Sequence, residues 1–359
     1  MKKRVGILTS GGDCPGLNAT IRGVAKALYH RFGDDVEIIG IVAGYHGLIH
    51  GEYHMMKPSD FSGILNVGGT ILGTARTPYS KMKVIEDDKI DKVQNMITNY
   101  KKMKLDCLLT LGGNGTHKTS NLLAEQGLNI IGLPKTIDND IFGTDVTFGF
   151  HSAVNTATDV IDRLHTTATS HKRVMVVEIM GNKAGWLTLY SGIAGGADVI
   201  IIPEIPFTLD KILAAVERRI GRKKGFSVIA VAEGAMDKKE AKMKKKERLA
   251  YRAENGESTV TNRIVRYLAE KGELDCRAVV PGHFLRGGPP SAYDRVLSSQ
   301  FGAYAAGLVA QEKYGVTVAL KNNQVCDNPL KEIAGKTKFV DPNDQLIATA
   351  RDVGTAFGD

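Results

Sequence analysis

The sequence predicts an α/β protein with two doubly wound α/β lobes and a cleft between them. Short apolar runs alternate with segments whose apolar residues recur at helical spacing, the rhythm of strand–helix–strand units. Glycine-rich turns follow several of these runs, where α/β proteins place their ligand-binding loops. A chain of 359 residues is long for one compact unit, so two lobes are the natural expectation.

The first half of the chain alternates strands and helices. Residues 5–9 form the first predicted strand, and an Ala-rich helical pattern follows a glycine turn and continues to about Arg31. Glycines that follow the second predicted strand, at 36–42, predict loops rather than a regular element. The remaining predicted elements are a strand at 36–42, a helix at 87–104, a strand at 105–111 and a strand at 130–133.

The second lobe is predicted to begin at the long helix 151–170, which is rich in Ala, Val and Thr. The glycines of 282–288 return the chain to the first lobe, and the sequence after Leu330 carries little signal. Between these points we expect strands at 174–179, 200–202, 227–231 and 277–280, and helices at 209–222 and 259–271.

Composition limits the function classes. Of the net charge of +8, a net +6 lies in residues 238–252, so the rest of the chain is nearly neutral and nucleic-acid binding is not expected. We interpret the segment as a solvated insertion, with an anionic effector or partner as the alternative. The four cysteines lack CxxC spacing and are expected to be reduced thiols, with Cys14 a small filler in its loop.

Hydropathy predicts neither a membrane span nor a signal peptide. No apolar run approaches about 18 residues, and the start of the chain passes directly into the first strand. We expect a cytoplasmic protein.

Two glycine loops suit phosphate binding. The loop at residues 10–18 and the loop at Gly112–Thr116 each end a predicted strand and open a helix, so backbone N–H groups are aimed at an anion. Neither is a Walker sequence. Two such loops on neighbouring strands predict a ligand with several phosphates, or two phosphorylated ligands, whereas tight turns alone are the bland alternative.

A polar loop follows the apolar run 130–133 and contains Asp138 and Asp140, two residues apart. If the segment is extended, the two carboxylates share a face. One could then accept a proton from a substrate hydroxyl while the other holds a cation or orients the first. In isolation, a capped turn explains the same residues equally simply.

Several further side chains suit a phosphorylated substrate. Planar guanidinium groups bind phosphate in bidentate fashion, and a carboxylate at a strand end such as Glu233 can receive sugar hydroxyls. The candidate arginines are Arg76, Arg173, Arg277 and Arg286. His165 and His171 are expected to be structural or on a helix surface, and no histidine or cysteine pattern has zinc spacing.

An ordered set of motifs resembles the bacterial-type 6-phosphofructokinases. The matching segments are GGDCPGLN at 11–18, GGTILGTAR at 68–76, GGNGT at 112–116, PKTIDND at 134–140, VEIMG at 177–181, IAGGAD at 193–198, PE at 203–204, EGA at 233–235 and GHFLRGGPPSAYDR at 282–295. The resemblance spans residues 3 to about 300.

The resemblance implies catalytic roles around the 134–140 loop. Asp138 would be the general base for the 1-hydroxyl of fructose 6-phosphate, with Thr136, Asp140 and Arg76 at the reaction centre. The implied donor-binding residues are Gly12, Arg76, Thr77, Gly115, Thr116 and Lys135. The implied sugar-binding residues are Thr136, Asp138, Arg173, Met180, Gly181, Glu233, Arg277, His283 and Arg286.

The donor follows from two positions at which the family divides. Pyrophosphate-dependent members usually carry Asp at the place of Gly115, and that side chain opposes the α-phosphate of ATP. Lys135 is more typical of pyrophosphate-dependent members, although some ATP-dependent ones combine Gly with Lys. We give Gly115 more weight and expect ATP, because absence of the blocking group is the physical condition for admitting a nucleotide.

Two positions depart from the family pattern. Asn114 replaces an acidic residue often assigned to Mg²⁺, so a neutral amide oxygen or a water would meet the cation there. Asp140 is the other metal candidate. Asn182 stands where many members have a transition-state arginine, and Lys183 or Lys135 is the candidate replacement. Asp198 resembles a position in an effector site.

The resemblance therefore predicts an ATP-dependent 6-phosphofructokinase of glycolysis that requires Mg²⁺ and works as a homotetramer, with Arg173 and Arg277 reaching a neighbouring subunit's site. We expect residues 1–148 plus 285–335 to form the larger lobe with the donor site, and 149–284 plus 336–359 the smaller lobe with the sugar-phosphate site. The alternatives are the pyrophosphate-dependent enzyme and a catalytically weak sensor of phosphosugar or nucleotide.

Overall fold

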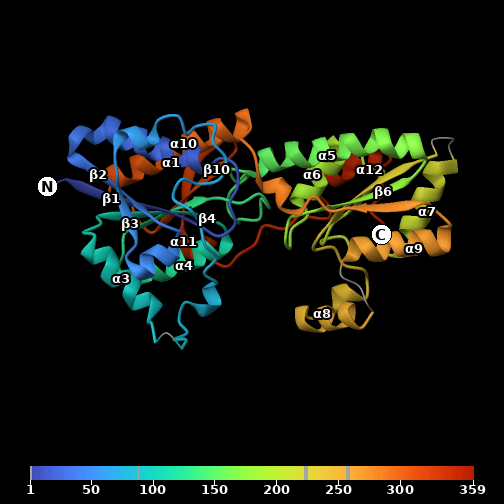
Figure 1. Cartoon of the computed structure of the whole chain (residues 1–359), viewed down its shortest axis with the longest axis horizontal. Coiled ribbons are helices and arrows are strands. Elements are labelled where there is room, and N and C mark those ends of the chain that lie inside the picture. The colour runs from blue at the N-terminus through green and yellow to red at the C-terminus, as the bar shows by residue number, and fades with distance from the viewer. Residues whose placement is uncertain (1, 88, 222–224, 256–258) are drawn as a thin grey trace. The chain divides into compact units, whose positions relative to one another are not determined.

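A computed structural model describes residues 2–87, 89–221, 225–255 and 259–359. The chain divides into two compact units (Figure 1). The first unit comprises residues 1–137, 141–152 and 286–338, and the second comprises 138–140, 153–285 and 339–359.

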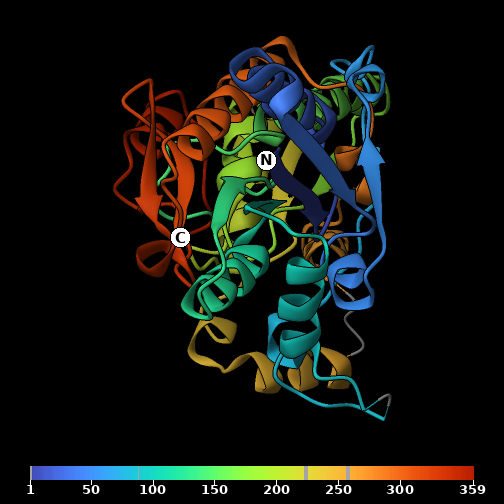
Figure 2. The same ribbon diagram turned by 90° about the vertical axis from the view of Figure 1, so that its left-hand side faces the viewer.

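The first unit is built on a mixed sheet with helices on both faces. Its strand order is β11-β10-β5-β4-β1-β2-β3, in which β5, β4, β1 and β2 run parallel. The strands are β1 (Lys3–Ser10), β2 (Val36–Ile41), β3 (Tyr53–Met56), β4 (Cys107–Gly112), β5 (Ile130–Pro134), β10 (Val316–Lys321) and β11 (Gln324–Pro329). Figure 2 shows this unit end-on, with β10 and β11 at one edge of the sheet and β3 at the other.

Helices pack on both faces of that sheet. Helices α1 and α10 lie side by side on one face, and α3 and α4 lie on the other (Figure 1). The helices of the unit are α1 (Leu17–Phe32), α2 (Tyr45–His50), α3 (Lys92–Lys102), α4 (Asn114–Glu125), α10 (Ala292–Ala310) and α11 (Leu330–Ile333). Burial on both faces explains why β4 is mostly apolar, with Thr110 as its one polar side chain.

The second unit has a smaller parallel sheet of order β7-β8-β6-β9. Its strands are β6 (Val174–Ile179), β7 (Val199–Ile201), β8 (Ser227–Ala232) and β9 (Cys276–Val279). The helices are α5 (Phe150–His171), α6 (Trp186–Ala194), α7 (Leu209–Arg219), α8 (Lys245–Glu254), α9 (Val260–Gly272) and α12 (Gln345–Asp352). One core cluster joins α7 and α9 to β6, β7 and β8.

The α/β class and the order of the predicted elements are confirmed, with differences in detail. The expectation of loops after residue 42 was wrong, because α2 and β3 lie there. The helix predicted at 87–104 begins later, at Lys92, where the Asp91 side chain accepts the Gln94 N–H as an N-cap. The predicted end of the helix at Arg222 lies outside the described residues.

The weakly patterned C-terminal segment contributes to the second unit. The Ala356 carbonyl accepts the Ile200 N–H, and the Val340 N–H donates to the Glu204 carboxylate. Tertiary contacts of this kind leave no periodicity in the sequence. In the described part of the chain, no helix is long and apolar enough to cross a membrane.

Candidate active site

The loop between β1 and α1 is held by a second glycine-rich loop of the first unit. The Gly11 N–H donates to the Ala75 carbonyl at 3.2 Å, and the Thr74 hydroxyl donates to the Gly11 carbonyl at 2.7 Å. These bonds place Thr74 and Ala75, the two residues before Arg76, beside the β1–α1 turn. The side chain of Arg76 is exposed, and that of Thr77 is half-buried.

Asn18 ties the same two loops together, a role that its motif did not reveal. Its amide donates to the carbonyls of Val67 and Gly68, each at 3.1 Å, and its Oδ1 accepts the Ile71 N–H at 2.8 Å. Because the side chain is almost fully buried, the loop from Gly68 to Arg76 is fixed against the start of α1.

The second glycine loop lies between β4 and α4, directly beside the first. Thr9 and Ser10 of β1 pair with Leu111 and Gly112 of β4, so both loops leave the same edge of the sheet. Gly112 must be glycine, because a Cβ there would lie 2.1 Å from the Thr116 hydroxyl oxygen. The Thr116 carbonyl accepts a hydrogen bond from Tyr45 at 3.1 Å.

Both helices that follow these loops begin without a side-chain cap. Gly16 precedes α1 and Gly113 precedes α4, and neither helix has an acidic residue in its first turn. The backbone N–H groups at the start of an α-helix have no partner within the helix, and the helix dipole favours negative charge there. Two such helix starts on adjacent strands suit a polyphosphate.

Gly115 is exposed in the first turn of α4. A Cβ built at Gly115 meets no atom within 4 Å, in contrast to Gly112, and its backbone φ is not positive. Protein packing therefore does not require glycine at this position. Asn114, immediately before it, is half-buried.

Lys135 brings a positive charge to the two loops. Its side chain is buried, and its ammonium group donates to the Gly12 carbonyl. Its backbone N–H donates to the Gly112 carbonyl at 3.0 Å. Lys135 follows β5, the strand next to β4, so three neighbouring strand ends contribute to this region.

The polar loop after β5 is not extended. Asn139 adopts a left-handed conformation with φ of 51°, which Asn tolerates better than most residues. The condition under which Asp138 and Asp140 would share one face, an extended backbone, is therefore not met. Thr136 and Asp140 are buried and Asp138 is half-buried, and the Thr136 carbonyl accepts the Thr147 hydroxyl at 2.7 Å.

In the second unit, Glu233 follows β8 and contacts the loop after β6. Its Oε1 accepts the N–H groups of Gly181 and Asn182 at 3.2 and 2.7 Å, and its own N–H donates to the Ile179 carbonyl. Asn182 has φ of 54°, so the loop turns sharply there. The exposed Glu233 and the half-buried Met180 thus come from adjacent strand ends.

Arg173 and Arg277 share one carboxylate. Arg173 Nε donates to Asp275 at 2.6 Å, and Arg277 Nη1 donates to the other oxygen of Asp275. The hydrogen bond from Arg173 lowers the pKa of Asp275 and outweighs the opposing effect of burial. Two guanidinium groups on one surface carboxylate leave a net positive patch.

Arg286 and His283 belong to one 3₁₀ turn, Gly282–Arg286. Arg286 Nη1 donates to the Asp13 carbonyl at 3.0 Å and would lie 2.8 Å from a Cβ at Gly12. Its buried Nε has no hydrogen-bond partner in the described part of the chain. The His283 side chain is exposed.

The basic segment 238–252 is more than a solvated insertion. Glu240 is completely buried and accepts hydrogen bonds from Arg252 and Arg263, each at 2.6 Å. Arg252 also donates to the Ala235 carbonyl at 2.9 Å. These contacts anchor α8, whose lysines remain exposed, as does Leu249.

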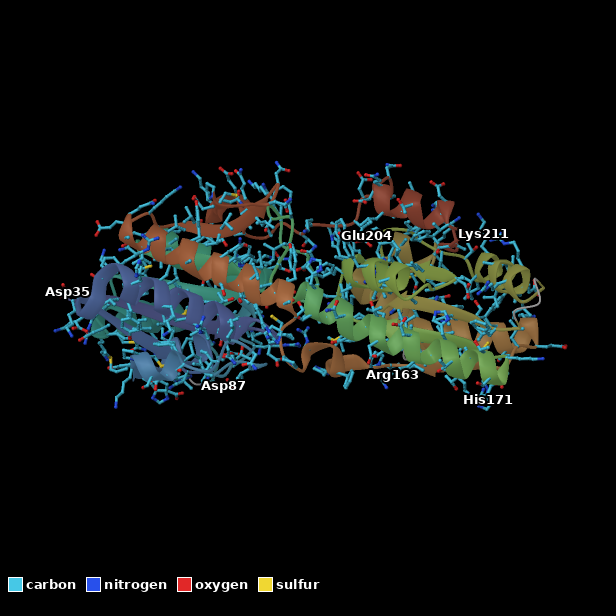
Figure 3. All side chains as sticks on the ribbon, turned by 90° about the horizontal axis from the view of Figure 1, so that it is seen from above. Asp35, Asp87, Arg163, His171, Glu204 and Lys211 are labelled. Carbon is cyan, nitrogen blue, oxygen red and sulfur yellow. The ribbon has the colours of Figure 1, made fainter. Side chains whose placement is uncertain are left out.

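Cys14, His165 and His171 were expected to have structural or surface roles. Cys14 is buried and burial raises its pKa to about 12, which agrees with a filler rather than a reactive thiol. His165 Nε2 donates to the Gly195 carbonyl at 2.7 Å. Figure 3 shows His171 at the end of α5, where it is exposed.

The carboxylate of Asp198 is engaged within its own unit. It forms an ion pair with Arg219 at 2.8 Å and accepts hydrogen bonds from Ser227 and from the Val228 N–H. Among the described residues, no group of three or more histidine, cysteine, aspartate or glutamate side chains could hold a metal ion.

Comparisons with known proteins agree on the family. The family model described as Phosphofructokinase matches residues 4–309. An ATP-dependent 6-phosphofructokinase from Spirochaeta thermophila is 55% identical over 357 residues, covering 99% of this chain and 97% of that relative.

Solved structures show the same fold. Phosphofructokinase from Saccharomyces cerevisiae matches with a TM-score of 0.79 and 30% identity over 92% of this chain, which spans 45% of the yeast chain. Pyrophosphate-dependent phosphofructokinase from Nitrosospira multiformis matches with a TM-score of 0.82 over 99% of this chain and 89% of its own, and at 20% identity this likeness concerns the fold alone. The chain therefore belongs to the phosphofructokinase family.

Proposed function

We propose that this protein transfers the γ-phosphoryl group of ATP to the 1-hydroxyl of fructose 6-phosphate, giving fructose 1,6-bisphosphate and ADP. The similarity to an ATP-dependent 6-phosphofructokinase over nearly the whole length of both chains supports this activity. Phosphoryl transfer needs little covalent chemistry from a protein, so the residues act by positioning and by neutralising charge.

The observation that carries the choice of donor is the open space at Gly115. Beyond its chain neighbours and its own helix backbone, a Cβ at this position meets no atom of the described residues within 4 Å, so only a ligand would require the glycine. The uncapped start of α4 and the β1–α1 loop with Gly12 supply N–H groups for the phosphates, with Thr116 beside them. Ala75 accepts a hydrogen bond from the Gly11 N–H, and Arg76 and Thr77 come directly after Ala75. Arg76 and Thr77 would line the donor.

Lys135 favours a phosphorylated donor of either kind. Its ammonium group at the Gly12 carbonyl would attract the β- and γ-phosphates of ATP as well as pyrophosphate. It contributes charge without filling the space at Gly115, and it is therefore compatible with ATP. Pyrophosphate is the second candidate donor.

Asp138 is the proposed general base. It would accept the proton of the 1-hydroxyl while that oxygen forms a bond to the γ-phosphorus and the bond to the bridging oxygen of ADP breaks. Asp140 and Thr136 would orient the base and the hydroxyl. Arg76 and Lys135 would stabilise negative charge on the transferring group.

The sugar phosphate is proposed to bind at the strand ends of the second unit. Oε1 of Glu233 is occupied by the Gly181 and Asn182 N–H groups, which leaves its second oxygen for a sugar hydroxyl, beside Met180. His283 and Arg286 would hold the 6-phosphate. Arg286 has an unused Nε for this purpose.

Mg²⁺ is the proposed metal. Its chemistry fits the side chains present, since Mg²⁺ takes oxygen ligands and is usually held by one or two protein groups together with substrate phosphates rather than by a protein cage. Asn114 and Asp140 are the proposed contacts. When bound with ATP, Mg²⁺ would neutralise the β- and γ-phosphates.

We propose that each lobe carries one of the two substrate sites. Residues 1–148 plus 285–335 would carry the donor site, and 149–284 plus 336–359 the sugar-phosphate site. Arg173 and Arg277, which are held by Asp275, would complete the sugar-phosphate site of a neighbouring subunit in a homotetramer.

A parallel assay tests the proposed function. Purified protein is given fructose 6-phosphate and Mg²⁺ with either ATP or pyrophosphate, and formation of fructose 1,6-bisphosphate is measured. We expect turnover with ATP. Turnover only with pyrophosphate would overturn the donor assignment, and binding without turnover on either donor would indicate a sensor.

A further inference from the structure

Arg286, the side chain proposed for the 6-phosphate of the sugar, also contacts the loop between β1 and α1. Its Nη1 donates to the Asp13 carbonyl at 3.0 Å, and both residues belong to the first unit. Gly12, directly before Asp13, is one of the residues proposed for the donor. The donor loop is therefore in contact with a side chain proposed for the other substrate.

Gly12 has no room for a side chain on the side that faces Arg286. A Cβ at Gly12 would lie 2.8 Å from Nη1, 3.0 Å from Cζ and 3.4 Å from Nη2 of Arg286. These separations are shorter than a van der Waals contact of about 3.5–4.0 Å, so the guanidinium would have to move. The backbone φ of Gly12 is not positive, so the conformation alone does not demand glycine. Within the protein, the requirement for glycine at this position comes from Arg286.

The backbone that carries Arg286 is fixed by a second close approach. A Cβ at Gly68 would overlap the Gly288 carbonyl, so the two backbones are in direct contact. The Gly68 carbonyl in turn accepts the Asn18 side-chain amide at 3.1 Å. Because the backbone two residues after Arg286 is held in this way, Arg286 can respond to an added Cβ at Gly12 only with its flexible side chain.

Two cations hold successive carbonyl groups of the loop. The Lys135 ammonium group donates to the Gly12 carbonyl, and Arg286 donates to the Asp13 carbonyl. Hydrogen bonds from charged donors are stronger than those between neutral groups. The conformation of the loop and the position of the Arg286 guanidinium therefore depend on each other.

We propose that Gly12 is a positioning residue for fructose 6-phosphate. By leaving the space beside its Cα empty, Gly12 allows the Arg286 guanidinium to take the position from which it binds the 6-phosphate. Bidentate binding of phosphate depends on the direction of the guanidinium plane, so a displaced guanidinium keeps its charge but loses that geometry. The inference rests on the proposed function, in which Gly12 serves the donor and Arg286 the sugar phosphate.

Gly12→Ala separates this role from a role toward ATP alone. The added methyl group displaces only the far end of a flexible side chain, so the fold should be retained, which a far-UV circular dichroism spectrum checks. We expect Kd for fructose 6-phosphate, measured by isothermal titration calorimetry without any donor, to rise about ten- to a hundredfold, the range for one hydrogen bond to a charged group. A glycine that only ATP requires would leave this Kd unchanged.

Gly307 of α10 provides a matched control. It also faces an arginine of the first unit, but a Cβ there would lie 3.6 Å from Arg31 Nη2, which is an ordinary contact distance, and its φ is not positive. Gly307→Ala should therefore bind fructose 6-phosphate with a Kd within about twofold of the wild type.

Arg286→Ala tests whether the effect of Gly12 passes through the guanidinium. Kd for fructose 6-phosphate should rise in this variant. Adding Gly12→Ala to it should raise Kd by no more than about twofold further, because the group that the methyl displaces is absent. If the two substitutions instead multiply their separate effects, Gly12 acts by another route and the inference is rejected.

The remaining outcomes separate this inference from the proposed function. If the wild type binds and phosphorylates fructose 6-phosphate while Gly12→Ala binds it with an unchanged Kd, only the role of Gly12 is rejected. If the wild type itself does not bind fructose 6-phosphate, the proposed function fails and this inference fails with it.

Discussion

Gly115 is the residue at which the choice of phosphoryl donor can be tested most cleanly. Gly115→Asp should be accepted by the fold, because a Cβ there meets nothing within 4 Å. The added carboxylate would face the phosphates of ATP, and like charges in contact cost several kcal/mol. We expect kcat/KM for ATP to fall by at least about a hundredfold, measured by steady-state kinetics.

A matched control shows whether a loss of activity with ATP comes from the charge at the donor site or from any replacement of glycine by aspartate. Gly221 in the second unit also has open space around a Cβ and no positive φ, so Gly221→Asp makes the same change outside the unit that carries the proposed donor site. Its kinetics with ATP should match the wild type. Unchanged ATP kinetics in Gly115→Asp would show that the donor binds elsewhere.

Asp138 is expected to control the chemical step. Asp138→Asn removes the proposed base with little change in volume, so kcat should fall by about 10²–10⁴-fold, the usual contribution of a general base. KM for fructose 6-phosphate should change little. A variant with nearly wild-type kcat would reject Asp138 as the base.

At the residue scale, the sequence predicts the kinds of side chain better than their geometry. The glycines at 112 and 115 look alike in the sequence, yet one is required by contact with Thr116 and the other is not required by the protein at all. The left-handed Asn139 could not be foreseen from two aspartates two residues apart. Asp13 and Arg286 are 273 residues apart, and no local pattern connects them.

At the scale of elements, the basic segment 238–252 depends on a buried ion cluster. Glu240 is held by Arg252 of α8 and by Arg263 of α9. Arg252→Met removes the two hydrogen bonds from Arg252 to Glu240 and the one to the Ala235 carbonyl, while Arg263 remains. We expect the free energy of unfolding to fall by about 1.5–3 kcal/mol, measured by urea denaturation. Lys246→Gln, on the exposed side of α8, should change it by less than about 0.5 kcal/mol.

The same cluster makes stability depend on pH. Burial alone would raise the pKa of Glu240, but the hydrogen bonds from Arg252 and Arg263 outweigh it and the pKa lies below its ordinary value of 4.5. A lowered pKa gives stability that is present above pH 4.5 and is lost as the pH falls through the lowered value. Between these two values, the wild type should lose stability more steeply than Glu240→Gln. Parallel acid denaturation curves would contradict this.

Local signals predict the order of the elements better than their boundaries. The glycine turns and the buried run of β4 are local signals whose elements follow the predicted order, whereas the Asp91 cap was missed and the helix predicted from residue 87 begins at Lys92. The anchoring of α8 is not local, since Glu240 finds Arg263 on another helix. A run of lysines and arginines therefore looked like a solvated surface although two of its residues, Glu240 and Arg252, are part of a buried contact.

At the scale of the whole molecule, Arg173 and Arg277 raise the question of shared sites. If these arginines complete a neighbouring subunit's site, an Asp138→Asn subunit and an Arg173→Ala/Arg277→Ala subunit can together form one intact site. Random reassociation of the two inactive variants should then restore about a quarter of wild-type activity, because half of the pairs are hybrids with one intact site of two. No recovery after verified exchange of subunits would contradict the proposal.

The central claim is the transfer of phosphate from ATP to one particular hydroxyl. The direct measurement is ³¹P NMR of fructose 6-phosphate incubated with the protein, Mg²⁺ and ATP, with pyrophosphate in a parallel sample. We predict a new phosphate ester at carbon 1 and ADP in equal amounts in the ATP sample. A new ester at another carbon, or formed only with pyrophosphate, would contradict the account.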